Sequence, residues 1–211
     1  AQYADYPDDV KILLGEMFAA VTMVADNLKF SGAVSLQSKG DGALTRSLAE
    51  CRDQHYLRGI AHVATDKAAD IRSSNLADWL GNGQLALSLL PDKSTRMNPY
   101  QGLVEIDPAG LAASLEGYFQ NSEQLQTRLH FASLDGTTTG LLLQRLPDAP
   151  EASEVSIAAA DDDWLTLTTL AASVTTEELA TLAPKQMLLR LFHEYPCELY
   201  SPRSLSFRCS C

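Results

Sequence analysis

The sequence lacks the features that would assign it to several common classes. No apolar run near the N-terminus exceeds residues 17–25, far short of the roughly 20 residues needed to cross a bilayer. No segment has the basic, apolar and small-residue order of a signal peptide. Positive charge is also scarce, because 16 Lys and Arg stand against 27 Asp and Glu and the net charge is −11. Since such a chain is repelled by phosphate backbones and anionic lipid, we expect neither nucleic acid nor a membrane as its partner.

Motifs of common enzymes are missing or lie in the wrong context. H-E-x-x-H, G-x-S-x-G and Walker-type sequences do not occur. Residues 81–86 (GNGQLA) match a dinucleotide-binding pattern, but the glycines precede an alternating strand instead of a helix, so we expect a turn. His55 and His62 are expected on opposite faces of one strand, and the three aspartates at 161–163 on solvated surface. We therefore expect no catalytic or cofactor-binding residues, and not an enzyme.

Hydrophobic periodicity predicts an α+β fold with antiparallel sheets packed around one buried helix. Asp8 to Leu28 is apolar on nearly every face, and a helix of this kind that is too charged for a bilayer should be enclosed by protein. Alternating runs at 33–38, 43–51, 56–64, 84–90 and 100–106 predict strands joined by tight turns. We also expect helices at 75–80 and 109–121, and a hairpin of 128–134 with 139–146 around Asp135-Gly136.

A change of pattern at residues 147–151 (PDAPE) predicts a domain boundary. Helical periodicity follows at 153–173, 176–182 and 184–193, with a capping-box sequence at Thr175 to Glu178. We expect an α+β core at 1–150 and a helical linker at 151–205.

Cysteine is rare, and its placement is uneven. Of Cys51, Cys197, Cys209 and Cys211, two lie within the last three residues. A chain of this size needs no disulfides, and the spacing is not that of paired bridges, so a reducing cytoplasm is expected. Free cysteine is most often a small buried apolar residue, and the roles of Cys51 and Cys197 stay open.

Cys209-Ser210-Cys211 has a spacing that suits half of a zinc site. Extended residues two apart point to the same side with alpha carbons roughly 6.6 Å apart, and two thiolates on tetrahedral zinc lie just under about 4 Å from each other. A disulfide across the same pair would be strained and readily reduced, and Arg208 should favour the thiolates. The pair taken alone leaves open the alternative of two incidental thiols.

Short motifs spread along nearly the whole chain provide further context. In chain order they are Asp5-Tyr6-Pro7, Lys29-Phe30, Gly40-Asp41-Gly42, Arg58-Gly59, Gly81-Asn82-Gly83, Tyr100-Gln101-Gly102, Tyr118-Phe119, Ser122-Glu123-Gln124-Leu125, Thr127-Arg128, Leu142-Leu143-Gln144, Thr176-Glu177-Glu178-Leu179, His193-Glu194 and Phe207-Arg208-Cys209-Ser210-Cys211. In this combination the chain resembles the 33-kDa heat-shock protein family, the bacterial redox-regulated holdase chaperones.

The resemblance implies a function and a mechanism. Family members hold zinc through a C-x-C and a later C-x-x-C pair, so Cys209 and Cys211 correspond to the first metal-ligand pair and redox switch. Oxidation joins each pair, releases zinc, and unfolds the zinc domain and linker. The active protein, commonly a homodimer, binds unfolding client proteins without ATP and passes them to downstream ATP-dependent chaperones.

Compared with the family pattern, the chain lacks the stretch before Asp5 and the second cysteine pair, so 206–211 is expected to be the start of a truncated zinc-binding redox-switch domain. We therefore expect client binding even in the reduced state. The candidate client surface is leucine-rich and comprises Leu165, Leu167, Leu170, Leu179, Leu188, Leu189 and Leu191. The alternatives are a thiol-disulfide oxidoreductase, although no C-x-x-C opens a helix, and a constitutive zinc-binding scaffold.

Overall fold

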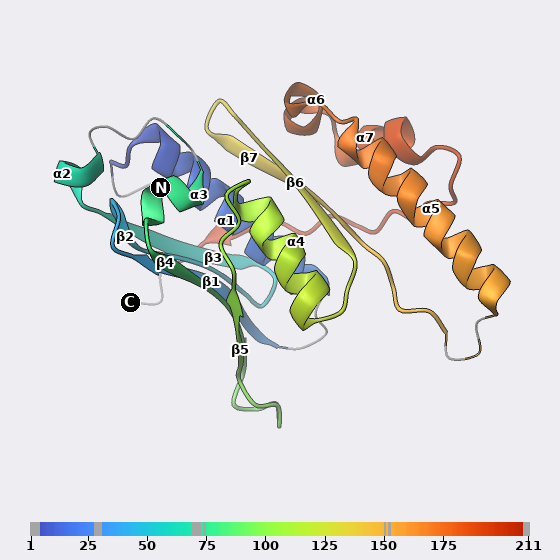
Figure 1. Cartoon of the computed structure of the whole chain (residues 1–211), viewed down its shortest axis with the longest axis horizontal. Helices are drawn as coiled ribbons and strands as arrows, with labels where there is room; N and C mark the ends of the chain where they lie inside the picture. The colour runs from blue at the N-terminus through green and yellow to red at the C-terminus, as the bar shows by residue number, and fades with distance from the viewer. Residues whose placement is uncertain are drawn as a thin grey trace.

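Helix α1 (Asp8–Asn27) lies between two sheets in the computed structural model (Figure 1). The structure describes residues 5–27, 31–68, 73, 75–149, 151 and 153–208. The helix is apolar over most of its circumference, so both sides must be removed from water. Its buried residues are Val10, Leu13, Leu14, Met17, Ala20, Val21, Val24 and Ala25. The predicted α+β fold around a buried central helix is confirmed, while Leu28, its predicted last residue, lies outside the described residues.

Six strands form the larger sheet, in the order β5-β4-β1-β2-β3-β8. All neighbours are antiparallel except β3 and β8, which are parallel. The strands are β1 (Gly32–Gly40), β2 (Leu44–Arg52), β3 (Tyr56–Val63), β4 (Gly83–Pro91), β5 (Tyr100–Val104) and β8 (Ser206–Phe207). Its apolar face packs on α1, where the hydroxyl of Ser47 lies 3.3 Å from the sulfur of Met17.

A two-stranded sheet of β6 (Thr127–Leu134) and β7 (Thr137–Gln144) covers the other side of α1. The strands meet at Asp135 and Gly136, whose φ values of 49° and 76° are those of the primed turn that suits a two-residue hairpin. The predicted hairpin is confirmed, although β6 begins one residue earlier than predicted and β7 begins and ends two residues earlier.

Three further helices pack against this core. They are α2 (Thr65–Ala68), α3 (Leu76–Leu80) and α4 (Leu111–Ser122). The helix predicted at 75–80 is present, but it begins one residue later, because the side chain of Asn75 accepts the backbone N–H of Ala77 and caps the helix. Helix α4 begins two residues later than predicted, because Asp107 accepts the backbone N–H of Ala109 in a turn that Gly110 completes with φ 116°.

Two glycine turns interlock beside α3. The backbone N–H of Gly42 donates to the carbonyl of Leu80 at 2.8 Å, and Asp41 accepts the backbone N–H of Asn82 at 2.8 Å. The hydrogen bonds from Asn82 hold the pKa of Asp41 below its usual value. Strand β4 starts at Gly83, so residues 81–86 are a turn followed by a strand, as predicted.

The predicted linker helices are α5 (Glu154–Ala172), α6 (Thr176–Thr181) and α7 (Pro184–Phe192), with the capping box of Thr175 and Glu178 in place. They lie on the far side of β6 and β7 from α1 (Figure 1) and form a second apolar cluster there with Ala132 of β6. Residues 145–149, at the predicted boundary, have no regular structure. The division into core, linker and switch domain stays a prediction.

Substitution of Gly42 by alanine tests the interlocked turns. A Cβ there would lie 2.5 Å from the carbonyl oxygen of Trp79 and 2.7 Å from the carbonyl carbon of Leu80. Because both neighbours are backbone, we expect Gly42→Ala to lower the free energy of unfolding by about 1–3 kcal/mol in urea titrations. Gly117→Ala on α4, where a Cβ meets nothing within 4 Å, is the matched control and should be neutral or stabilising by about 0.5–1 kcal/mol. Equal stability of Gly42→Ala and wild type would contradict this packing.

Candidate functional site

Cys209 and Cys211, the predicted zinc ligands and redox switch, lie outside the described residues. Their role therefore stays a prediction. The chain that leads to them is described as far as Arg208, and residues 203–208 form an extended segment that we call the strap. Its contacts determine the position of Arg208, the residue directly before Cys209 in the sequence.

The strap lies along the outer edge of β3 (Figure 1). Ser206 N–H donates to the carbonyl of His55 and Arg208 N–H to the carbonyl of Leu57, both at 2.9 Å. The ring Nδ1 of His55 lies 3.0 Å from the carbonyl of Ser204 and therefore donates to it. Main-chain hydrogen bonds thus hold the strap as a short parallel strand.

Three charged or aromatic contacts add to this pairing. The guanidinium of Arg208 lies 4.9 Å from the ring centre of Tyr56, within range of a cation–π contact. Arg203 forms an ion pair with Asp26 near the end of α1 and donates to the side-chain oxygen of Gln54. The strap therefore connects three parts of the core, namely β3, the turn before it and α1.

His55 lies in that turn and not on the strand, contrary to our prediction. Asp53 and Gln54 before it have φ values of 50° and 59°, a left-handed backbone that ends the strand pairing. This turn exposes the carbonyl and ring of His55 to the strap.

A groove of about 530 Å³ runs between α1, β3 and β7 beside the strap. Its lining is largely apolar and includes Phe18 and Met23 of α1 and Leu57 of β3, while Leu205 of the strap lies at one side. Nothing in the sequence pattern predicted this groove, because its walls come from segments that are far apart in the chain, such as α1 and β7.

The donor chemistry of Cys209 and Cys211 fits half of a zinc site. Thiolates are preferred zinc ligands, and a structural site needs two further ligands. Within the described part of the chain, no group of three or more His, Cys, Asp and Glu residues could hold a metal ion.

Cys51 and Cys197 are both free. Cys51 on β2 is only 1% exposed, and burial raises the pKa of its thiol, so it is a poor nucleophile. Cys197 is exposed in the segment after α7, with its sulfur 3.8 Å from the carbonyl of Phe192.

The linker leucines divide into exposed and packed groups. Leu165 is 67% and Leu189 57% exposed, whereas Leu179 and Leu191 are buried. Leu167, Leu170 and Leu188 are partly buried against the same cluster, which also contacts Leu141 and Leu143 of β7. In this state most of the predicted client surface is therefore covered by helix packing against the hairpin.

The aspartates at 161–163 are exposed, as predicted. Asp161 forms an ion pair with Arg145 at the end of β7, and Asp163 accepts the hydroxyl of Tyr195 at 3.3 Å. These contacts attach α5 to the end of β7 and to the segment after α7.

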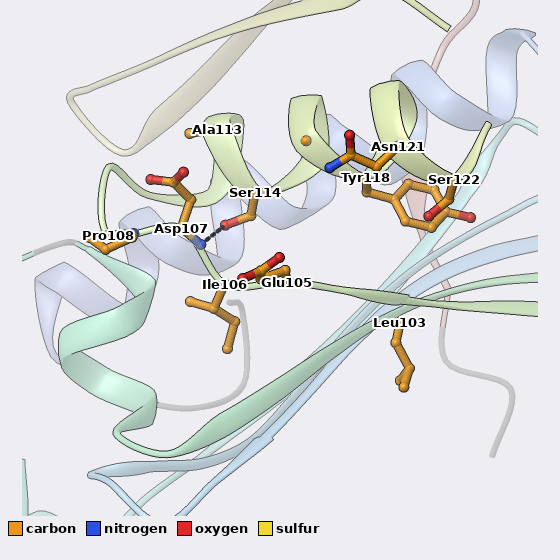
Figure 2. A pocket seen from close by; sticks show the side chains of 11 residues that line it. Leu103, Glu105, Ile106, Asp107, Pro108, Ala113, Ser114, Tyr118, Asn121 and Ser122 are labelled. Carbon is orange, nitrogen blue, oxygen red and sulfur yellow. Dashed lines mark hydrogen bonds between the residues drawn. The ribbon is translucent and has the colours of Figure 1, made fainter. Parts of the chain in front are cut away.

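A cavity of about 350 Å³ lies between β5 and α4 (Figure 2). The backbone N–H of Asp107 donates to the hydroxyl of Ser114 at 2.9 Å, and Leu103 points away from the helix. Tyr118 donates to Glu123 at 2.6 Å, and burial, followed by this hydrogen bond, raises the pKa of its hydroxyl. The polar groups near the helix thus serve mainly to close the turn before α4 and to hold its end.

Glu16 of α1 lines a smaller cavity of about 270 Å³ at the start of α4, beside Asn75 and Phe131. Burial raises the pKa of its carboxyl from 4.5 to about 7. Between these two values the folded protein binds more protons than the unfolded chain, so stability falls as pH rises through this window.

Both the fold and the sequence are similar to those of known proteins. The fold is shared with the crystal structure of the 33 kDa chaperonin (heat shock protein 33 homolog) of Thermotoga maritima, at a TM-score of 0.70 and 17% identity over 94% of this chain and 67% of that one. The family model described as Hsp33 protein matches residues 1–211. The chain belongs to the Hsp33 family, which confirms the resemblance in sequence.

Curated relatives agree with this assignment. The 33 kDa chaperonin of Shewanella denitrificans is 36% identical over 98% of this chain and 67% of its own length. That of Pseudomonas syringae pv. syringae is 39% identical over 98% of this chain and 66% of its own length. The chain thus spans about two thirds of the length of these relatives. Among the described residues, no helix combines the length and apolar character needed to span a membrane.

The pH dependence of stability tests the environment of Glu16. We expect Glu16→Gln to raise the free energy of unfolding by about 1–3 kcal/mol at pH 8, where the wild type buries a carboxylate, and to change it by less than about 1 kcal/mol at pH 5. Urea titrations at the two pH values measure both. Glu105→Gln, at an exposed position, is the control and should change the free energy of unfolding by less than about 0.5 kcal/mol. An equal effect of Glu16→Gln at pH 5 and 8 would contradict the raised pKa.

Proposed function

We propose that this chain is part of a redox-regulated, ATP-independent holdase chaperone that binds unfolding proteins and prevents their aggregation. The observation that carries the proposal is the match of the whole chain to the Hsp33 family, whose curated relatives are named 33 kDa chaperonin. The C-x-C pair that follows the strap supports the redox part of the proposal.

Cys209 and Cys211 are the proposed switch. When bound, zinc would keep both residues as thiolates and hold a small domain folded, because structural zinc contributes on the order of 10–16 kcal/mol. In oxidation by peroxide, the two thiols lose two electrons and two protons, a disulfide forms between Cys209 and Cys211, and the peroxide is reduced to two molecules of water. Disulfide sulfurs are poorer zinc ligands than thiolates, so oxidation and metal release are coupled.

Arg208 supports thiolate formation in this scheme. Its charge stands next to Cys209 in sequence, and its contact with Tyr56 limits where the guanidinium can move. A neighbouring cation lowers the pKa of a thiol and thereby increases the fraction that reacts with peroxide.

The linker is the proposed element that responds to the switch. Its helices are attached to the hairpin by one small apolar cluster, centred on Ala171, Leu179 and Leu191. A segment with so few buried contacts is a low-stability part of a structure. Its release would expose both the linker leucines and the face of β6 and β7 that they cover.

The cellular setting follows from the family resemblance alone. We propose that the protein acts in the cytoplasm, is a homodimer when active, and passes its clients to ATP-dependent chaperones. Each of these belongs to the whole protein, of which this chain spans about two thirds by comparison with its relatives.

Aggregation of a heat-unfolded client, followed by light scattering, tests the function. We expect reduced wild type already to suppress scattering and peroxide-treated wild type to suppress it more strongly, and Cys209→Ser/Cys211→Ser to be insensitive to peroxide. Cys197→Ser is the matched control, since that thiol is also exposed, and it should respond like wild type.

Other outcomes of this experiment separate the alternatives. Equal suppression in reductant and in peroxide would leave a holdase without a redox switch. No suppression by wild type in either condition would overturn the proposal. Thiol-dependent reduction of insulin would indicate an oxidoreductase, and zinc content unchanged by peroxide would indicate a constitutive scaffold.

A further inference from the structure

The outer edge of β3 is only partly occupied. The strap pairs with it over two residues, Ser206 beside Tyr56 and Phe207 beside Leu57. Farther along, the backbone N–H of Ala61 donates to the hydroxyl of Tyr6 at 3.1 Å. No other strand of the described chain pairs with this edge. An edge strand of this kind is a template on which another extended polypeptide can add.

The strap also places a side chain beside the groove next to this edge. Leu205 contributes to the lining together with Phe18, Ala19 and Met23 of α1, and the groove retains about 530 Å³ with Leu205 in place. Among the described residues that line the groove, Lys11 is the one that carries a charge. A single leucine therefore takes part in an apolar surface that could accommodate several such side chains.

The strap thus combines two contacts that peptide-binding proteins use together. Main-chain hydrogen bonds to a sheet edge provide affinity that is independent of sequence, and pockets beside the edge accept alternate side chains. Resting on the function proposed above, we propose that the groove between α1, β3 and β7 binds extended apolar segments of client proteins. The strap occupies one end of it as an intramolecular substitute for a client.

Weak attachment makes the strap suited to displacement. All residues from 203 to 208 are exposed, and its charged contacts with Asp26 and Tyr56 are at the surface. Exposed pairs of this kind contribute little to stability. Because the strap directly precedes Cys209, a change that unfolds the chain at the thiols reaches the strap first.

Direct peptide binding tests the groove. The probe is a fluorescent peptide of about ten alternating valine and serine residues, about twice a typical strand, measured by fluorescence anisotropy with the reduced protein. Ser206→Pro removes the N–H that pairs with His55 without touching the core. We expect this variant to bind the probe about tenfold more tightly or better, because a tethered competitor has been weakened.

Three further measurements separate strand addition from nonspecific binding. The same peptide with alternate amides N-methylated should bind Ser206→Pro weakly, because it cannot pair with the edge. Adding Ala19→Lys, which places a charge in the groove, should abolish the gain, whereas adding Ala159→Lys on the exposed surface of α5 should not. A synthetic peptide of residues 201–208 should displace the probe.

Contrary results would overturn the proposal in identifiable ways. If Ser206→Pro and wild type bind the probe with the same affinity, the strap does not block the groove. If the N-methylated peptide binds as tightly as the unmodified probe, binding does not occur by strand addition. Self-association of Ser206→Pro without probe binding would assign the groove to a second copy of the chain.

The aggregation assay distinguishes failure of this inference from failure of the function. Equal suppression of client aggregation by oxidised wild type and oxidised Ala19→Lys would support the holdase function. It would also show that the groove is not the client-binding site. If wild type does not suppress client aggregation in either redox state, the proposed holdase function is wrong.

Discussion

The enclosure of α1 is the constraint on which the rest of the structure depends. A helix with apolar residues on nearly every face cannot be covered by one sheet, because a sheet contacts only one side of a helix. The six-stranded sheet covers one side and the hairpin β6–β7 the other. Since these two sheets are not joined at β3 and β7, the enclosure leaves an apolar groove along α1.

The hairpin is shared between two apolar clusters, and this sharing connects the core to the linker. Because side chains alternate along a strand, Leu129 and Leu142 face α1 while Ala132, Leu141 and Leu143 face the linker helices. A two-stranded sheet is marginal by itself. Each cluster therefore helps to stabilise the hairpin for the other, and loss of the linker would weaken the cover over α1.

Much of the fold could be predicted from sequence because it depends on local patterns. The period-two runs, the Asp135-Gly136 turn and the Thr175 capping box all specify structure within a few residues. Errors arose where backbone conformation overrode the pattern, as at His55, which the positive φ of Asp53 and Gln54 places in a turn. The resemblance to a family was also a property of short motifs, and the comparison with the Hsp33 model confirmed it.

Only part of the candidate site could be predicted from local sequence patterns. By itself the sequence determined that α1 is buried, that the sheets are antiparallel, and that two cysteines stand together after Arg208. Only the tertiary structure decided that the strap pairs with β3 and that Leu205, Phe18 and Met23 line one groove. Hydrophobic periodicity reports which face of an element is covered, but not which distant segment covers it. That choice depends on how whole sheets and helices pack, and it brings together residues that are far apart in the chain.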